Sequence, residues 1–173
     1  RDGLQNEKTP LTLEQRKALI LDLMKTGLKS IEVGSCVSAK WVPQMAQSDV
    51  LFAQLPKDPN IQFSLLTPNS KGFEAARAVG CQEVAVFTAA SESFTQKNIN
   101  CSIDESLEKF SDVMAAAKAS NIKVRGYVSC MVDCPYEGAI APKKVAIVSK
   151  RLLDLGCYEI SLGETIGIAT PDR

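Results

Sequence analysis

Helix-like and strand-like patterns alternate along this chain, and the alternation restricts the fold more than any other feature of the sequence. The strand-like runs are short and apolar, and amphipathic stretches long enough for helices separate them. Strands are expected at 29–34, 61–66, 83–88, 123–130 and 158–162, and helices at 13–26, 48–54, 71–79, 103–119 and 142–155. A polar loop is expected at 91–102. Such alternation predicts parallel strands joined by helical crossovers.

Two architectures fit this alternation, an open doubly wound sheet and a (β/α)8 barrel. Polar clusters follow strand after strand, at 32–35, 67–69, 91–92, 129–130 and 163–165. Barrel enzymes build their sites from many such strand ends, whereas an open sheet concentrates its site at one switch point. No Gly-x-Gly-x-x-Gly or Walker A pattern occurs. The sequence therefore predicts an α/β fold, a partial TIM barrel from about the end of strand 1 through strand 6, with 1–173 as one incomplete domain.

Composition excludes several classes of protein. Lys plus Arg and Asp plus Glu both number 20, so no basic excess indicates a nucleic-acid partner. No apolar run is long enough to span a bilayer, and no leader peptide is visible at the start. The six cysteines lack zinc or disulfide-framework spacing and are interpreted as reduced. Both ends look cut, because the chain starts without Met and stops where Thr170 and Pro171 are typical of a helix start.

Arg1, Asp2 and Gly3 form the most informative short motif. A hard cation such as Mg2+ prefers oxygen ligands, which Asp2 offers. A fixed guanidinium beside it can stabilise negative charge that develops on an enolate oxygen. Asp-Gly is also a common surface-turn dipeptide, and these residues alone favour that simpler interpretation.

Longer segments extend this motif into a family resemblance. Arg-Asp-Gly-x-Gln is similar to the first-strand motif of the metal-dependent Claisen-type barrel superfamily. Segments throughout the chain resemble the hydroxymethylglutaryl-CoA lyase family in particular. They lie at 1–8, 40–45, 66–69, 90–94, 97–102, 125–130, 134–138 and 159–163. The resemblance therefore covers essentially the whole chain.

The resemblance implies roles for individual residues. It makes Asp2 a ligand of a divalent cation, Mg2+ or Mn2+, and Arg1 a catalytic residue that contacts the substrate thioester oxygen. Glu32 matches a catalytic-site glutamate, and Glu164 stands where the family commonly has the shorter Asp. Residues implied to line the acyl-CoA pocket, which turn or strand-end hydrogen bonding would explain equally well, are Ser35, Asn98, Tyr127, Ser161 and Thr165. Arg125 either orients substrate or holds the barrel mouth through an ion pair.

Cys134, Pro135 and Tyr136 match one of two Cys-Pro-Tyr segments in the family. The catalytic cysteine belongs to the other, which follows paired glycines late in the barrel, whereas Asp133 precedes Cys134. Cys134 is therefore not interpreted as the catalytic thiol. The sequence contains no histidine, so the family's His-x-His metal ligands are absent from it.

For the intact protein, the resemblance implies cleavage of 3-hydroxy-3-methylglutaryl-CoA to acetyl-CoA and acetoacetate, a step in leucine breakdown and ketone-body formation. The chain alone is expected to be inactive. The implied partner is the acyl-CoA substrate, without nucleic acid or membrane, and a homodimer is compatible with it. The expected compartment is the cytoplasm in a bacterium or the mitochondrial matrix in a eukaryote. A different superfamily lyase or synthase and a non-catalytic chain stay open as alternatives.

Overall fold

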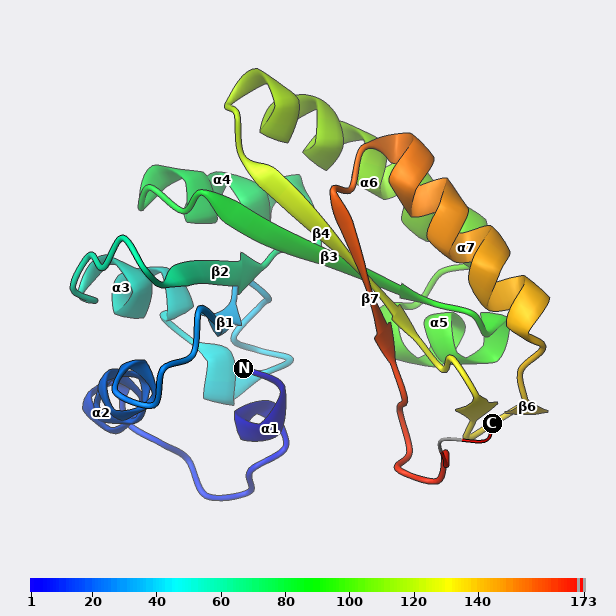
Figure 1. Ribbon diagram of the computed structural model, residues 1–173, viewed down its shortest axis with the longest axis horizontal. Coiled ribbons are helices and arrows are strands. Elements are labelled where there is room, and N and C mark those ends of the chain that lie inside the picture. Colours follow the sequence, from blue (N-terminus) through cyan, green and yellow to red (C-terminus); the bar gives the residue numbers. More distant parts are fainter. Residues whose placement is uncertain (171, 173) are drawn as a thin grey trace. The chain divides into compact units, whose positions relative to one another are not determined.

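The computed structural model describes residues 1–170 and 172, and its main element is a five-stranded sheet (Figure 1). The strand order is β1-β2-β3-β4-β7. Packing divides the chain into two compact units, Arg1–Ala85 and Val86–Arg173, and the division falls inside β3 (Glu83–Ala89). The pairs β1–β2, β2–β3 and β4–β7 are parallel, which confirms the alternating pattern read from the sequence.

The first unit contains the first two strands of the sheet and several short helices. Its elements before β3 are α1 (Asp2–Gln5), α2 (Leu13–Met24), β1 (Ser30–Ser35), η1 (Pro43–Met45), α3 (Ser48–Ala53), β2 (Gln62–Leu66) and α4 (Ser70–Ala78). A reciprocal capping box starts α2, in which the Thr12 hydroxyl accepts from Gln15 N and the Gln15 side chain accepts from Thr12 N. Helices α2 and α3 both pack against β1.

The second unit packs two long helices on one side of two strands. Its elements after β3 are α5 (Glu92–Ile99), α6 (Ile103–Ala119), β4 (Lys123–Ser129), β5 (Asp133–Cys134), β6 (Gly138–Ala139), α7 (Pro142–Leu155) and β7 (Glu159–Gly163). Figure 1 shows α6 and α7 side by side along β4 and β7. The glycine at position 126 lets α7 approach β4 closely: a Cβ on Gly126 would lie 3.1 Å from both Leu152 Cδ1 and Cys157 Sγ.

The structure corrects one expected element and adds others. The segment 91–102, expected to be a loop, contains the helix α5. Its polar composition hides it, but the Ser91 hydroxyl caps it by accepting from Phe94 N at 3.1 Å, and Thr95 is buried in it. The short elements α1, η1 and the β5–β6 hairpin were also not expected. The other expected boundaries agree within two residues, and α6 and α7 match at both ends.

Within the described part of the chain, no helix combines the length and the apolar character needed to cross a lipid bilayer. All six cysteines are free thiols, and Cys36 alone among them is not buried. The helix start expected at Thr170 and Pro171 falls partly outside the described residues.

Candidate functional site

Arg1 and Glu32, two of the expected catalytic residues, contact each other in the first unit. Arg1 Nε donates to Glu32 Oε1 in an ion pair, and the Arg1 amino nitrogen donates to the Glu32 carbonyl oxygen at 3.0 Å. The two side chains are only 12% and 13% exposed, so water screens this pair weakly. The structure therefore holds the Arg1 guanidinium at a fixed place beside β1.

A β-bulge places Glu32 at an irregular point of the sheet. Glu32 faces Ser64 of β2 while Gly34 faces the next residue, Leu65, so Val33 is an extra residue in β1. A bulge bends a strand and re-aims its side chains, and bulges are over-represented next to active sites. Periodicity alone gives no sign of it, because an apolar residue occupies the inserted position.

Ser35 ends β1 and is 1% exposed. Its backbone nitrogen donates to Ser48 Oγ at 3.1 Å, and Ser48 donates in turn to Met45 O at 2.7 Å. The Ser35 hydroxyl oxygen is buried and has no hydrogen-bond partner among the described residues. The Ser35 hydroxyl is therefore an unsatisfied polar group at the end of β1.

Asp2, the expected metal ligand, offers one well-exposed carboxylate. Its side chain is 82% exposed and lies 3.3 Å from Arg1 Nη1. Among the described residues, no group of three or more His, Cys, Asp or Glu side chains gathers to hold a metal ion. Mg2+ requires close to six donors in octahedral array. The described residues alone therefore do not form a cation site around the Asp2 carboxylate.

Tyr127 and Ser161 lie on one face of the sheet in the second unit. They are register partners in the parallel β4–β7 pair. On β4 the residues alternate between buried positions under the helices and half-buried positions that include Tyr127. Parallel register partners point to the same side of a sheet, so the structure brings these two expected substrate-binding residues together.

Arg125 occupies the same face, near the start of β4. Its Nη2 lies 3.2 Å from both Glu159 Oε2 and Tyr158 Oη. Barrel sites form at the carboxyl ends of strands, and Ser129 at that end of β4 is four residues, or about 13 Å, further along. Of the two roles expected for Arg125, the structure shows the ion pair.

Glu164 and Thr165 follow β7 and bond within their own surroundings. Glu164 Oε2 accepts from Gly167 N, while Oε1 is buried and has no partner among the described residues. Thr165 Oγ1 accepts from Cys130 N at 2.8 Å and so joins the loop after β7 to the end of β4. A local hydrogen bond thus accounts for the Thr165 hydroxyl oxygen, whereas one Glu164 oxygen is left without a protein partner among the described residues.

The Cys134 thiol lies in a polar environment that the sequence did not indicate. Ser91 Oγ is 3.0 Å from Cys134 Sγ, and Tyr136 N donates to this sulfur at 3.4 Å. Burial opposes ionisation of Cys134, but the hydrogen bonds from Ser91, from two backbone nitrogens and from Cys130 together lower its pKa. Cys130 differs, because burial raises the pKa of its thiol to about 11.

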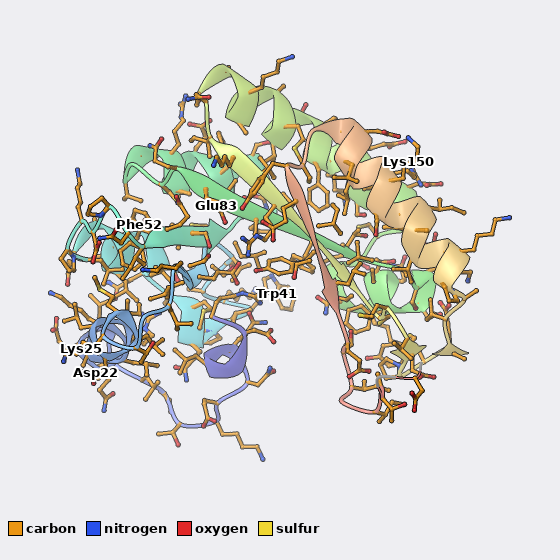
Figure 2. All side chains as sticks on the ribbon, in the orientation of Figure 1. Asp22, Lys25, Trp41, Phe52, Glu83 and Lys150 are labelled. Carbon is orange, nitrogen blue, oxygen red and sulfur yellow. The ribbon has the colours of Figure 1, made fainter. Side chains whose placement is uncertain are left out.

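Two further residues are exposed, the expected pocket residue Asn98 and Trp41 of the segment 40–45. Asn98 is exposed near the end of α5, on the helix that also lines a shallow surface depression with Glu92, Ser93, Gln96 and Lys97. Trp41, labelled in Figure 2, is 80% exposed, and Lys40 Nζ lies 5.9 Å from its ring centroid. Trp41 is therefore not a buried packing residue of the first unit.

Comparison with known proteins identifies the group to which this architecture is similar. A model of the HMGL-like family matches residues 1–173. The chain is 58% identical over 173 residues to the hydroxymethylglutaryl-CoA lyase of Pseudomonas mevalonii, covering 100% of this chain and 58% of that protein. It is 56% identical over 171 residues to the mitochondrial hydroxymethylglutaryl-CoA lyase of Bos taurus, covering 99% of this chain and 53% of that protein.

Solved structures agree with the fold. The hydroxymethylglutaryl-CoA lyase of Pseudomonas aeruginosa superposes with a TM-score of 0.95 at 54% identity, covering 98% of this chain and 57% of that one. An HMG-CoA lyase from Acinetobacter baumannii, solved in complex with coenzyme A and 3-methylmalate, gives 0.94 at 29% identity, covering 99% and 56%. The chain thus spans little more than half the length of the relatives it matches, which confirms the partial α/β barrel.

Proposed function

Because the chain belongs to the HMGL-like family, we propose that the intact protein is a hydroxymethylglutaryl-CoA lyase. It cleaves 3-hydroxy-3-methylglutaryl-CoA to acetyl-CoA and acetoacetate. The identity of 58% to a lyase of that name over the whole chain supports this substrate. The coenzyme A bound to a structural relative supports an acyl-CoA ligand.

The observation that carries this proposal is the ion pair by which Glu32 of β1 fixes the guanidinium of Arg1. Cleavage of the carbon–carbon bond leaves electrons on the acetyl-CoA fragment, and the thioester oxygen takes up the negative charge as an enolate. A guanidinium held in advance stabilises that charge without reorganising during the reaction. Glu32 serves Arg1 as its orienting carboxylate, and Arg1 is the residue that meets the substrate oxygen.

The reaction also needs a base for the proton of the tertiary hydroxyl. Glu164 is our candidate within this chain, because one carboxylate oxygen is buried and has no partner among the described residues. Its other oxygen is anchored by Gly167 N, which fixes the side chain. Tyr127 and Ser161 line the pocket for the acyl group of the substrate, and Ser35 and Asn98 are further substrate contacts.

The proposed enzyme uses a divalent cation, Mg2+ or Mn2+, because the family is metal-dependent. Asp2 is the ligand that this chain contributes. The described residues do not complete a coordination shell, so no step of the mechanism above passes through the metal. The intact protein is proposed to be a homodimer, in the cytoplasm of a bacterium or in the mitochondrial matrix of a eukaryote.

Replacing Arg1 with Gln in the intact protein tests the proposal. We expect acetoacetate release to continue with kcat lowered about 100- to 1,000-fold, the usual loss when an oxyanion donor is removed. Arg77→Gln is the matched control, because Arg77 pairs with Glu74 on the exposed surface of α4. Absence of lyase turnover in the wild-type protein would contradict the proposal, and so would equal kcat values for the Arg1 and Arg77 variants.

A further inference from the structure

We propose that Gln44 is a positioning residue that holds the Arg1–Asp2 segment on the strand carrying Glu32. This inference rests on the proposed function, since it concerns how the same site is assembled. Gln44 lies in η1, in the loop between β1 and α3. Its side-chain amide bonds to the backbone of residues 7–11, so it acts on Arg1 and Glu32 indirectly, through the backbone that carries them.

The Gln44 amide bonds to three backbone groups of the segment that follows α1. Gln44 Oε1 accepts from Leu11 N at 2.9 Å. Gln44 Nε2 donates to Thr9 O at 3.0 Å and to Glu7 O at 3.5 Å. These groups lie 33 to 37 residues away in sequence, so one side chain fastens an irregular, exposed segment to a distant loop.

The loop that carries Gln44 is itself fixed by a buried cation on α2. Arg16 is 4% exposed, and its two terminal nitrogens donate to Gln44 O at 3.0 Å and to Ala46 O at 2.5 Å. A buried charge is costly unless hydrogen bonds satisfy it, so these two carbonyls must stay in place. The backbone on both sides of Met45 therefore has little freedom to move.

This arrangement joins the two segments that form the Arg1–Glu32 ion pair. Arg1 caps α1, α1 packs against η1, and the chain then runs through residues 7–11 to α2. Glu32 lies on β1, which leads directly into the Gln44 loop. A methionine at position 44 would keep the length of the side chain while removing all three hydrogen bonds. The Arg1 guanidinium would then no longer be held in a fixed position against Glu32, although both residues would be present.

The first measurement needs no activity. In the intact protein, Gln44→Met should accelerate hydrogen–deuterium exchange of the Leu11 amide and the preceding segment, while Gln54→Met should not. Gln54 is a suitable control, because it is an exposed glutamine of the same unit with a 3.4 Å contact to Lys17 Nζ. Unchanged exchange in Gln44→Met would overturn the proposal even if lyase activity were never found.

The second measurement is kinetic. Displacing a reacting group by about 1 Å can cost about 100-fold in rate, so Gln44→Met should lower kcat by about 10- to 100-fold with KM little changed. Gln44→Glu keeps an acceptor for Leu11 N but sets a carboxylate oxygen against the Thr9 and Glu7 carbonyls, so it should lower kcat at least as much as Gln44→Met. In an Arg1→Lys background the Gln44→Met loss should largely vanish, because the two residues act through one interaction.

A purely structural role for Gln44 predicts different results. Losses at positions 1 and 44 would then multiply, and KM and the melting temperature would change together with kcat. Multiplicative losses, or a Gln44→Met enzyme with wild-type kcat, would refute the positioning role. If Gln44→Met is too unstable to purify, the same cycle with Gln44→Glu decides the question. A wild-type protein without turnover would refute the proposed function, and the exchange measurement would still test Gln44.

Discussion

Replacing Gly34 with Ala should destabilise the protein, because the added methyl group has no space beside the bulge in β1. A Cβ on Gly34 would lie 2.7 Å from Ser48 Cβ and 3.6 Å from Ser48 Cα. Ser48 cannot move away without cost, since its hydroxyl accepts from Ser35 N at 3.1 Å and donates to Met45 O at 2.7 Å. The substitution therefore forces either a displacement of α3 or the loss of these two hydrogen bonds.

The size of the effect follows from these two outcomes. Overpacking a filled site costs about 1–3 kcal/mol, and each lost hydrogen bond about 1 kcal/mol. Because the protein takes the cheaper of the two outcomes, we expect the free energy of unfolding to fall by about 1–2 kcal/mol. Urea unfolding of the intact protein, followed by circular dichroism, measures this difference.

Two variants separate the steric argument from a general intolerance of change. In Gly163→Ala the Cβ would lie 3.6 Å from Val128 O and 3.7 Å from Ser129 Cα, an ordinary contact distance, so little destabilisation is expected. Ser48→Gly removes the atoms that the new methyl would meet. The double variant Gly34→Ala/Ser48→Gly should therefore be no less stable than Ser48→Gly alone. Wild-type stability of Gly34→Ala, or additive losses in the double variant, would refute the reasoning.

Three further predictions concern ionisation and the metal. Ser91→Ala should raise the pKa of the Cys134 thiol, because burial already opposes ionisation and Ser91 is one of the groups that lower this pKa. Thiolate absorbance against pH measures this pKa, and an unchanged titration would contradict the prediction. Burial raises the pKa of Cys157 from 9.0 to about 12. The unfolded chain therefore loses this proton first as pH rises through 9.0, and stability should fall by about 1.4 kcal/mol at about pH 10. Equal alkaline slopes for wild type and Cys157→Ala would count against this. Finally, the 173-residue chain alone should show no acetoacetate release and no micromolar binding of Mg2+ or Mn2+ by calorimetry, because Asp2 offers a single carboxylate.

The sequence predicted the long elements well, because their local signals and their packing agree. Helix α6 has a capping box between Ser102 and Glu105, and α7 starts at Pro142 and is capped by Gly156 in a left-handed conformation. Helix α5 was missed because its polar residues resemble a loop. Its cap at Ser91 is visible in the sequence, but the bond from Ile103 N to Glu92 Oε2, at 3.0 Å, that ties it to α6 is not.

The sequence pointed to residues of the proposed site but not to their geometry. The family motif led to Arg1, Asp2 and Glu32, and the structure adds that Glu32 binds Arg1 from a bulged strand. An extra residue in one strand depends on the register of its neighbour, which a single sequence does not reveal. The role proposed for Gln44 was hidden for the same reason, because its partners lie 33 to 37 residues away.

Polar residues at strand ends have two explanations, binding and local hydrogen bonding, and the hydrogen bonds of individual atoms distinguish them. Thr165 Oγ1 already accepts from Cys130 N, so its place is explained without a ligand. The Ser35 hydroxyl and Glu164 Oε1 are buried and have no protein partner among the described residues. A buried polar atom left unsatisfied costs about 1–3 kcal/mol, and a fold retains that cost most readily where a ligand repays it. Ser35 and Glu164 are therefore stronger candidates for substrate contact than Thr165, and Ser35→Ala should change KM more than Thr165→Val does.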